Sequence, residues 1–183
     1  MNITLDDNKR LFLISDLHLM HDNIRKYCNR PFDNVQIMTE TLINNWNSTI
    51  TDEDQVFFLG DFVVGTDNPI EKSKYLFDCL NGIKYFIIGN HDEQKLRTDM
   101  PWYRGPILTT YRGHKLKLQH YPFKKDELRN GYKHFSGHTH SNILITNNEN
   151  QIVNVSCEAI NYTPILFTDI LLKLNVGQMA LTI

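Results

Sequence analysis

The sequence contains several short polar motifs whose side chains are typical metal ligands. The first, Asp16-x-His18, combines a carboxylate and an imidazole two residues apart. In an extended segment, residues at this spacing point to the same side, so the pair could hold one metal ion. The pair is common by chance, as is the second motif, Gly60-Asp61, which on its own indicates only a turn. Both motifs become more informative when they are considered together with the motifs that follow.

Two later motifs carry more chemistry. In Gly89-Asn90-His91-Asp92, the asparagine offers a neutral oxygen ligand, the histidine an acid or a base, and the glycine a tight turn. Gly137-His138-Thr139-His140 presents two imidazoles one residue apart, which suits ligation of two adjacent metal ions. With His120, the set forms a mixed nitrogen and oxygen shell. Such a shell is typical of Zn, Mn or Fe rather than of thiolate sites or Ca²⁺.

Apolar tetrads precede three of these motifs and predict the elements that position them. Continuous apolar runs of this length are typical of strands buried on both faces. Each run ends just before a polar motif: Leu11–Ile14 before Asp16, Val56–Leu59 before Asp61, and Tyr85–Ile88 before Asn90.

Two amphipathic helices are expected between these strands. The first begins after Asp33 or Asn34 as N-cap and runs from Val35 through Trp46, and the second begins at Asn68-Pro69 and stops near Gly82. Strands that alternate with helices indicate an α/β sheet, where ligands bind beyond the carboxyl ends of the strands. We therefore expect the three polar motifs to converge.

The second half of the chain has a different pattern. The segments Ile107–Arg112 and Lys115–His120 predict a hairpin that turns near Gly113. Short strands are expected over 134–137, 143–146 and 151–155, followed by a closing helix over Phe167–Leu174. This half is predicted to be antiparallel. Because no linker or repeat interrupts the chain, residues 1–183 are expected to form a single domain.

Composition excludes several classes of function. Nineteen basic and 21 acidic residues give a formal net charge of −2, so strong general binding to nucleic acid is not expected. Neither a signal peptide nor an apolar run that could span a membrane is seen. Cys28, Cys79 and Cys157 form no CxxC pair, and their odd number favours a reduced compartment, the cytoplasm, without a catalytic role for them.

The ordered motifs resemble those of the calcineurin-like metallophosphoesterase superfamily, and the resemblance covers nearly the whole chain. It rests on Asp16-x-His18, Gly60-Asp61, Gly89-Asn90-His91-Asp92, His120 and Gly137-His138-x-His140. The segments Ser15–Ile24, Arg30-Pro31-Phe32 and Asn161–Pro164 further resemble small bacterial and phage members. The resemblance implies an α/β (α+β) fold, a four-layer α/β/β/α sandwich of two mixed sheets flanked by helices, with a dimetal site at the strand ends.

The resemblance also implies roles for individual residues. One metal ion would be held by Asp16, His18 and His140, the other by Asn90, His120 and His138, with Asp61 as a bridge. His91 would lie beside the leaving oxygen, and Asp92 is a candidate to orient it. The implied cofactors are two divalent ions drawn from Mn, Fe, Zn or Ni, with Mn favoured.

Such a site predicts hydrolysis of small phosphodiesters or phosphomonoesters, cyclic or linear nucleotides included. Two metal ions about 3.5–4 Å apart can hold a bridging hydroxide that attacks phosphorus in line with the leaving group. His91 as imidazolium would protonate that group. We expect His21, Asn23 and Arg30 to bind substrate, Arg30 by bidentate contact with phosphate; the alternative is that Arg30 and His21 are ordinary surface and loop residues.

Two other functions remain open on the sequence alone. One is a nuclease of the same superfamily, which the absence of a basic surplus disfavours. The other is a scaffold that uses the metal pocket for binding without catalysis, which the complete ligand set and His91 disfavour. The sequence does not fix the oligomeric state.

Overall fold

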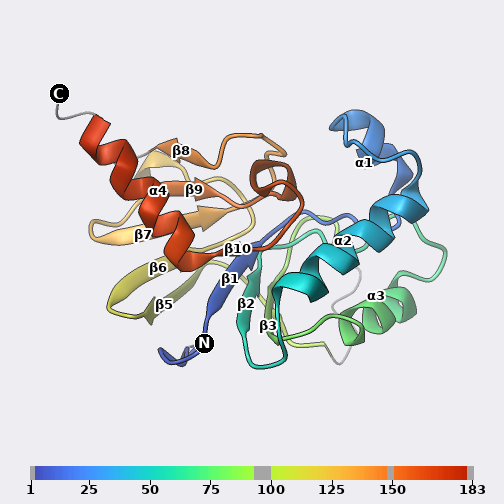
Figure 1. Cartoon of the computed structure of the whole chain (residues 1–183), viewed down its shortest axis with the longest axis horizontal. Helices are drawn as coiled ribbons and strands as arrows, with labels where there is room; N and C mark the ends of the chain where they lie inside the picture. Colours follow the sequence, from blue (N-terminus) through green and yellow to red (C-terminus); the bar gives the residue numbers. More distant parts are fainter. Residues whose placement is uncertain (1–2, 93–99, 148–150, 181–183) are drawn as a thin grey trace.

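Two five-stranded β-sheets form the framework of the protein (Figure 1). The structure is a computed structural model and describes residues 3–92, 100–147 and 151–180. The strand order is β10-β1-β2-β3-β4 in the first sheet and β5-β6-β7-β9-β8 in the second. Both sheets are mixed.

The first sheet has the parallel centre that the sequence predicts. Its four parallel strands are β1 (Leu11–Ile14), β2 (Gln55–Phe58), β3 (Ile83–Ile87) and β4 (Trp102–Tyr103). The short strand β10 (Ile165–Leu166) pairs antiparallel with β1 at the edge. Neither β4 nor β10 was expected from the sequence.

The second sheet differs from the expected antiparallel arrangement. Its strands are β5 (Ile107–Tyr111), β6 (His114–Leu118), β7 (Tyr132–Ser136), β8 (Ile145–Asn147) and β9 (Ile152–Asn154). The hairpin β5-β6 and the pair β8-β9 are antiparallel, but β6-β7 and β7-β9 are parallel. The prediction was wrong here because the crossovers between the parallel strands are mostly irregular loops, which carry no helical periodicity in the sequence.

In the described part of the chain, four α-helices accompany the sheets: α1 (Asp22–Tyr27), α2 (Val35–Thr49), α3 (Pro69–Asp78) and α4 (Phe167–Ala180). Helix α2 starts as predicted, since the Asn34 side chain caps it by accepting a hydrogen bond of 2.9 Å from the Ile37 N–H. Within the described residues, none of these helices has the length and apolar character needed to cross a bilayer.

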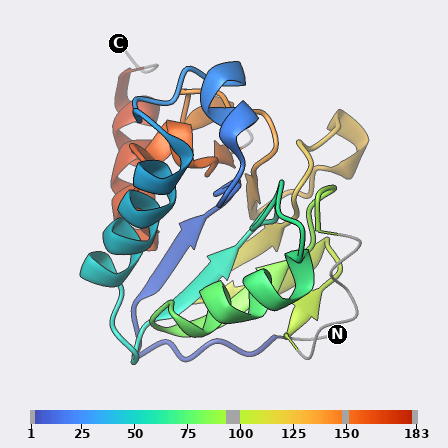
Figure 2. The ribbon, with the colours of Figure 1, turned by 90° about the vertical axis from the view of Figure 1, so that its right-hand side faces the viewer.

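Two hydrophobic cores lie on opposite faces of the first sheet. On the outer face, Phe58 and Phe86 pack with Trp46 of α2 and Leu76 of α3, and Figure 2 shows both helices in front of these strands. The inner core joins strands of both sheets and includes Phe167 of α4. Burial on both faces explains why the strands read as continuous apolar runs, and the predicted fold of two mixed sheets with flanking helices is confirmed.

Candidate dimetal site

Loops at the carboxyl ends of parallel strands from both sheets form the candidate site. Asp16, Asp61 and Asn90 follow β1, β2 and β3, as expected, whereas His120 follows β6, and His138 and His140 follow β7. Backbone hydrogen bonds continue beyond the strand ends, since the Asp16 N–H donates to the Gly60 carbonyl at 2.9 Å. The Gly137 N–H likewise donates to the His120 carbonyl at 3.0 Å. The strands therefore fix the spacing of the loops.

Five of the predicted ligands have backbone conformations that side chains rarely adopt. The φ angles are positive at Asp16 (61°), His18 (48°), Asp61 (61°), His138 (70°) and His140 (49°). The stretch from Asp16 to His18 is therefore not extended, and our explanation of that pairing by strand alternation was wrong. Left-handed residues other than glycine cost free energy and cluster at functional sites. Here they occur in the loops that follow β1, β2 and β7.

Glycines next to the ligands allow the loops to approach one another closely. A Cβ atom on Gly60, whose φ is +99°, would lie 2.6 Å from both the Gly89 nitrogen and Nδ1 of His120. A Cβ atom on Gly137 would lie 2.3 Å from Oδ2 of Asp16. The glycines of the motifs are thus required by contacts between loops from different strands.

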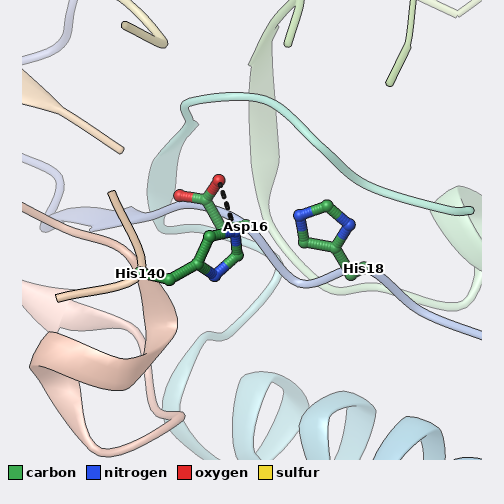
Figure 3. Close-up of side chains that lie close together, drawn as sticks. All are labelled: Asp16, His18 and His140. Carbon is green, nitrogen blue, oxygen red and sulfur yellow. Dashed lines mark ion pairs between the residues drawn. The ribbon is translucent and has the colours of Figure 1, made fainter. Parts of the chain in front are cut away.

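Asp16, His18 and His140 form the first half of the site (Figure 3). One potential ligand atom from each lies within 4.8 Å of the others, and Nε2 of His140 is 3.8 Å from Oδ1 of Asp16. Oδ1 of Asp16 and Nε2 of His18 are buried without a hydrogen-bond partner in the described part of the chain. Buried polar atoms normally have partners, so these orphaned atoms fit a bound cation.

The second half contains Asp61, His120 and His138, again with ligand atoms within 4.8 Å of one another. Asn90 belongs with them because its Oδ1 is 2.8 Å from Nε2 of His120 and 3.1 Å from Nδ1 of His138. The nitrogen and oxygen donors, without thiolate, suit a divalent transition metal.

Asp61 connects the two halves. Its Oδ2 lies 3.4 Å from Nε2 of His18 and 3.5 Å from Nε2 of His120. Burial alone would raise the pKa of Asp61, but His18 and His120 outweigh it and hold the pKa well below its usual range. The charged carboxylate therefore lies between the two halves, and its role as a metal bridge stays a prediction.

Two of the candidate histidine ligands favour the neutral form that binds metal, whereas Glu158 and Asp16 outweigh burial and raise the pKa of His140. Burial lowers the pKa of His18 and of His138, which favours the unprotonated imidazole that metals require. Nδ1 of His120 is 2.8 Å from the Leu59 carbonyl oxygen, so it carries the proton and donates it. This leaves Nε2 of His120 free for a metal ion.

His91 and Asp92 follow the ligand Asn90 directly. The His91 backbone N–H donates to Oδ1 of Asp61 at 2.9 Å, and its exposed ring lies edge-on to His18 with 5.3 Å between centroids. The carboxylate of Asp92 accepts hydrogen bonds from the backbone N–H groups of Gly89 and Asp61, at 3.0 and 2.6 Å. Asp92 therefore ties two ligand loops together, while its predicted role in orienting His91 stays a prediction.

Arg30 does not lie where a substrate could reach it, which corrects our expectation of a phosphate contact. Its side chain is fully buried and forms an ion pair of 2.8 Å with Glu158. Its remaining donors bond the backbone carbonyls of Leu17 and Asp16 at 2.8 and 2.7 Å. With its donors engaged inside the protein, Arg30 supports the loop that carries Asp16 and His18.

Glu158 is a functional residue that our sequence reading missed. Its Oε1 accepts a hydrogen bond of 2.9 Å from Nδ1 of His140. Burial would raise the pKa of Glu158, but His140 and Arg30 outweigh it and lower the pKa to about 2. A carboxylate behind a metal-binding histidine fixes its ring and tautomer. Glu158 lies in the short 3-10 helix Cys157–Ile160 after β9, and no continuous apolar tetrad precedes it, so the rule that located the other motifs does not reach it.

The two other predicted substrate-binding residues lie near the start of α1. His21 is half-buried, and its ring centroid lies 5.6 Å from that of His18 and 6.4 Å from that of His91. Burial, reinforced by His18, lowers the pKa of His21. Asn23 is exposed on α1. Contact of either residue with substrate stays a prediction.

A family model described as calcineurin-like phosphoesterase matches residues 9–162, a span that includes every residue of this site. The chain belongs to this family. Family membership implies a hydrolase that acts on phosphoesters with the help of metal ions, and the two clusters of ligand atoms agree with that implication.

Two similar proteins have no described activity. The chain is 39% identical to the uncharacterized protein MJ1445 of Methanocaldococcus jannaschii over 181 residues, which cover 96% of this chain and 97% of the relative. It also resembles the crystal structure of AQ665 from Aquifex aeolicus, a protein of unknown function, with a TM-score of 0.65. That likeness, at 22% identity, covers 89% of this chain and 98% of the other and concerns the fold alone.

Proposed function

We propose that this calcineurin-like protein hydrolyses small phosphodiesters or phosphomonoesters, nucleotides among them, with two divalent metal ions, manganese being favoured. The observation that carries the proposal is the position of Asp61, whose Oδ2 lies within 3.5 Å of a histidine from each half of the site. Two ions that share one carboxylate can engage a single phosphoryl group.

The chain supplies ligands and a bridge, and the ions supply the electrophilic chemistry. When bound, two such ions lower the pKa of water and stabilise charge on the phosphoryl oxygens. Asp16, His18 and His140 would hold one ion, and Asn90, His120 and His138 the other. Glu158 keeps His140 oriented.

His91 is the residue we assign to the leaving group. Its ring is exposed beside His18 and is tied to the bridge only through its backbone. In hydrolysis the bond from phosphorus to the leaving oxygen breaks, and a bond to the oxygen of water forms. The leaving oxygen takes a proton from His91, and water restores that proton to the ring. General acid catalysis of this kind contributes about 10²- to 10⁴-fold.

The test is hydrolysis of bis(p-nitrophenyl) phosphate and p-nitrophenyl phosphate by chelator-treated protein, with and without added Mn²⁺. We expect metal to restore turnover of both aryl esters. His91→Ala should retain metal and lose about 10²-fold or more in kcat on adenosine 3′,5′-cyclic phosphate, whose alkoxide leaving group needs the proton that p-nitrophenolate does not. His114→Ala is the matched control, because His114 lies on β6 outside both ligand clusters.

Three outcomes decide the matter. Metal-restored turnover of the aryl esters, with turnover of the cyclic phosphate falling in His91→Ala alone, supports the proposal. Equal turnover of the cyclic phosphate in His91→Ala and wild type overturns the role of His91. Two bound metal ions without turnover of either aryl ester would favour the non-catalytic scaffold instead.

A further inference from the structure

A cavity of about 670 Å³ opens beside the second half of the metal site. Its lining includes three candidate ligands of that half, Asn90, His120 and His138, together with Tyr121, Arg104 and Lys124. This volume falls within the range of small-molecule sites, about 300–1,000 Å³. The cavity is therefore large enough for an organic group attached to a phosphate held at the metal site.

Tyr121 offers this cavity an aromatic surface. Its side chain is 51% exposed although its ring packs against two metal-binding imidazoles, with centroids 4.8 Å from His138 and 5.1 Å from His120. The backbone at Tyr121 is fixed because its carbonyl accepts a hydrogen bond of 3.0 Å from Nε2 of Gln119. The exposed part of this ring is therefore available for stacking beside two of the candidate ligands.

Two cations face the same space without an acidic partner. Arg104 and Lys124 are both exposed, and no ion pair engages either side chain within the described ranges. The acidic lining residue, Glu127, uses its carboxylate to accept a hydrogen bond of 2.7 Å from the Lys124 backbone N–H. The Glu127 carboxylate keeps its negative charge, so two cations and one carboxylate give the lining a net charge of +1, which favours an anionic ligand.

His91 is not among the residues that line the cavity. His91 stands beside His18 and His21 in the first half, whereas the cavity begins at the ligands of the second half. If the leaving group departs beside His91, the cavity can hold the other organic group of the ester, the one that stays bonded to phosphorus. A phosphomonoester has no such substituent, whereas a phosphodiester does.

We infer that this cavity selects phosphodiesters whose retained substituent is a planar aromatic group bearing a further negative charge, as in a nucleotide. Tyr121 stacks with the ring, and Arg104 and Lys124 bind the additional anion. This inference rests on the proposed phosphoesterase activity and assigns that activity a substrate class.

Three substrates with one common leaving group test it with the Mn²⁺-loaded protein. They are methyl p-nitrophenyl phosphate, the p-nitrophenyl ester of thymidine 5′-phosphate, and the same ester with an added 3′-phosphate. We expect kcat/KM to rise roughly tenfold at each step, as base stacking and charge-assisted hydrogen bonds are added. Release of p-nitrophenolate is measured in every case.

Variants assign each step to its residues. Tyr121→Ala should abolish the gain from the nucleoside, and the double variant of Arg104→Gln with Lys124→Gln should abolish the gain from the 3′-phosphate. Tyr75→Ala and Lys125→Gln are matched controls, since both residues are exposed and lie outside the cavity lining. Calorimetric binding of thymidine 3′,5′-bisphosphate to metal-free protein gives a second readout, which should weaken in the cavity variants and not in the controls.

The outcomes separate this inference from the proposed function. Hydrolysis of the methyl ester without any gain from the nucleoside or 3′-phosphate overturns the inference and leaves the phosphoesterase in place. Gains that survive in the cavity variants also overturn it. If none of the three diesters is hydrolysed, the inference is wrong. The proposed function is wrong as well only if the aryl phosphates of the previous test are also not cleaved.

Discussion

At the scale of the residue, the site depends on unfavourable backbone conformations held in place by close contacts between loops. Asp16, His18 and Asp61 have positive φ angles, and each such residue costs about 1–3 kcal/mol unless its surroundings enforce it. The enforcement comes from hydrogen bonds between loops, such as the 3.0 Å bond from the His18 N–H to the Asp61 carbonyl. Small changes at loop contacts should therefore affect the metal site strongly.

Gly60→Ala tests this contact directly. Its Cβ would lie 2.6 Å from the Gly89 backbone nitrogen, which cannot move without shifting Asn90. We expect a loss of about 2–4 kcal/mol in the free energy of unfolding, together with weaker binding of Mn²⁺. Urea denaturation and metal titration measure the two effects.

Gly113→Ala is the control that separates backbone strain from crowding. Gly113 also has a positive φ, +77°, but a Cβ there would meet nothing within 4 Å. The Gly113→Ala variant should lose only about 1–2 kcal/mol in the free energy of unfolding and keep its affinity for Mn²⁺. Equal losses in the two variants would show that the loop contact at Gly60 has no particular importance.

Glu158→Gln tests the support behind His140. The substitution removes the charge that pairs with both His140 and the buried Arg30. We expect Mn²⁺ affinity to fall about 10- to 100-fold, as is usual when the partner of a metal-binding histidine is altered. Titration calorimetry measures the affinity, and Glu53→Gln, at a side chain that is 86% exposed, is the control. An unchanged affinity would contradict the supporting role.

The sequence predicted which candidate ligands lie together in the structure, but not the residues that support them. Asp16, Asp61 and Asn90 were found because each ends a continuous apolar run. Arg30 was misassigned because nothing local to residues 30–32 shows that its partner lies 128 positions away, at Glu158. Ligands follow from local pattern, whereas their supporting contacts depend on tertiary structure.

At the scale of the element, a buried carboxylate ties the starts of β1 and β2. Arg10, just before β1, contacts both oxygens of Asp54 at 2.8 and 2.6 Å, and the Thr51 N–H donates to Oδ2 at 2.7 Å. Burial would raise the pKa of Asp54, but the bonds from Arg10 and Thr51 outweigh it and lower the pKa. Asp54 thus stabilises the turn that leads into β2.

Asp54→Asn should therefore destabilise the protein in a pH-dependent way. Because the folded-state pKa lies below the unfolded value of about 3.9, the stabilisation is present above that pH and is lost as the pH falls through the folded-state pKa. We expect the variant to lose about 1–3 kcal/mol at pH 7, with the difference narrowing below about pH 4. Urea denaturation at several pH values measures this.

A surface carboxylate provides the comparison for that experiment. Asp78 pairs with Lys74 at 2.9 Å on α3, and its side chain is 57% exposed. Exposed pairs of this kind contribute about 0–1 kcal/mol, so Asp78→Asn should have little effect at any pH. A loss in Asp54→Asn that did not change with pH would indicate lost packing rather than lost charge.

Element length decided which parts of the fold were predictable. Helix α2 has 15 residues and a clear apolar face, and its start was predicted at the correct residue. Strands β4 and β10 have two residues each and helix α1 has six, too few for a period to show. The parallel pairing of β6 with β7 was missed for a different reason, since the connection between them is mostly an irregular loop without helical periodicity.

At the scale of the whole molecule, the metal site joins the two sheets. Asp16, Asp61 and Asn90 come from the first sheet, and His120, His138 and His140 from the second. Few of these ligands could meet if the sheets separated, so metal ions bound between them favour the folded state over any state in which the sheets are apart. Removal of metal should lower the stability of the entire fold and not only abolish activity.

We therefore expect a thermal unfolding midpoint that depends on metal. A free Mn²⁺ concentration 100 times the dissociation constant adds about 2.7 kcal/mol, which for a chain of this size corresponds to roughly 5–10 °C. Differential scanning calorimetry with Mn²⁺ or with a chelator measures the shift. His138→Ala, which removes a ligand of the second half, should show a smaller shift, whereas His114→Ala, outside both clusters, should match the wild type. Ions held by ligands from both sheets must stabilise the arrangement that brings those ligands together. Equal unfolding midpoints with metal and with chelator in the wild-type protein would therefore contradict a metal site between the sheets.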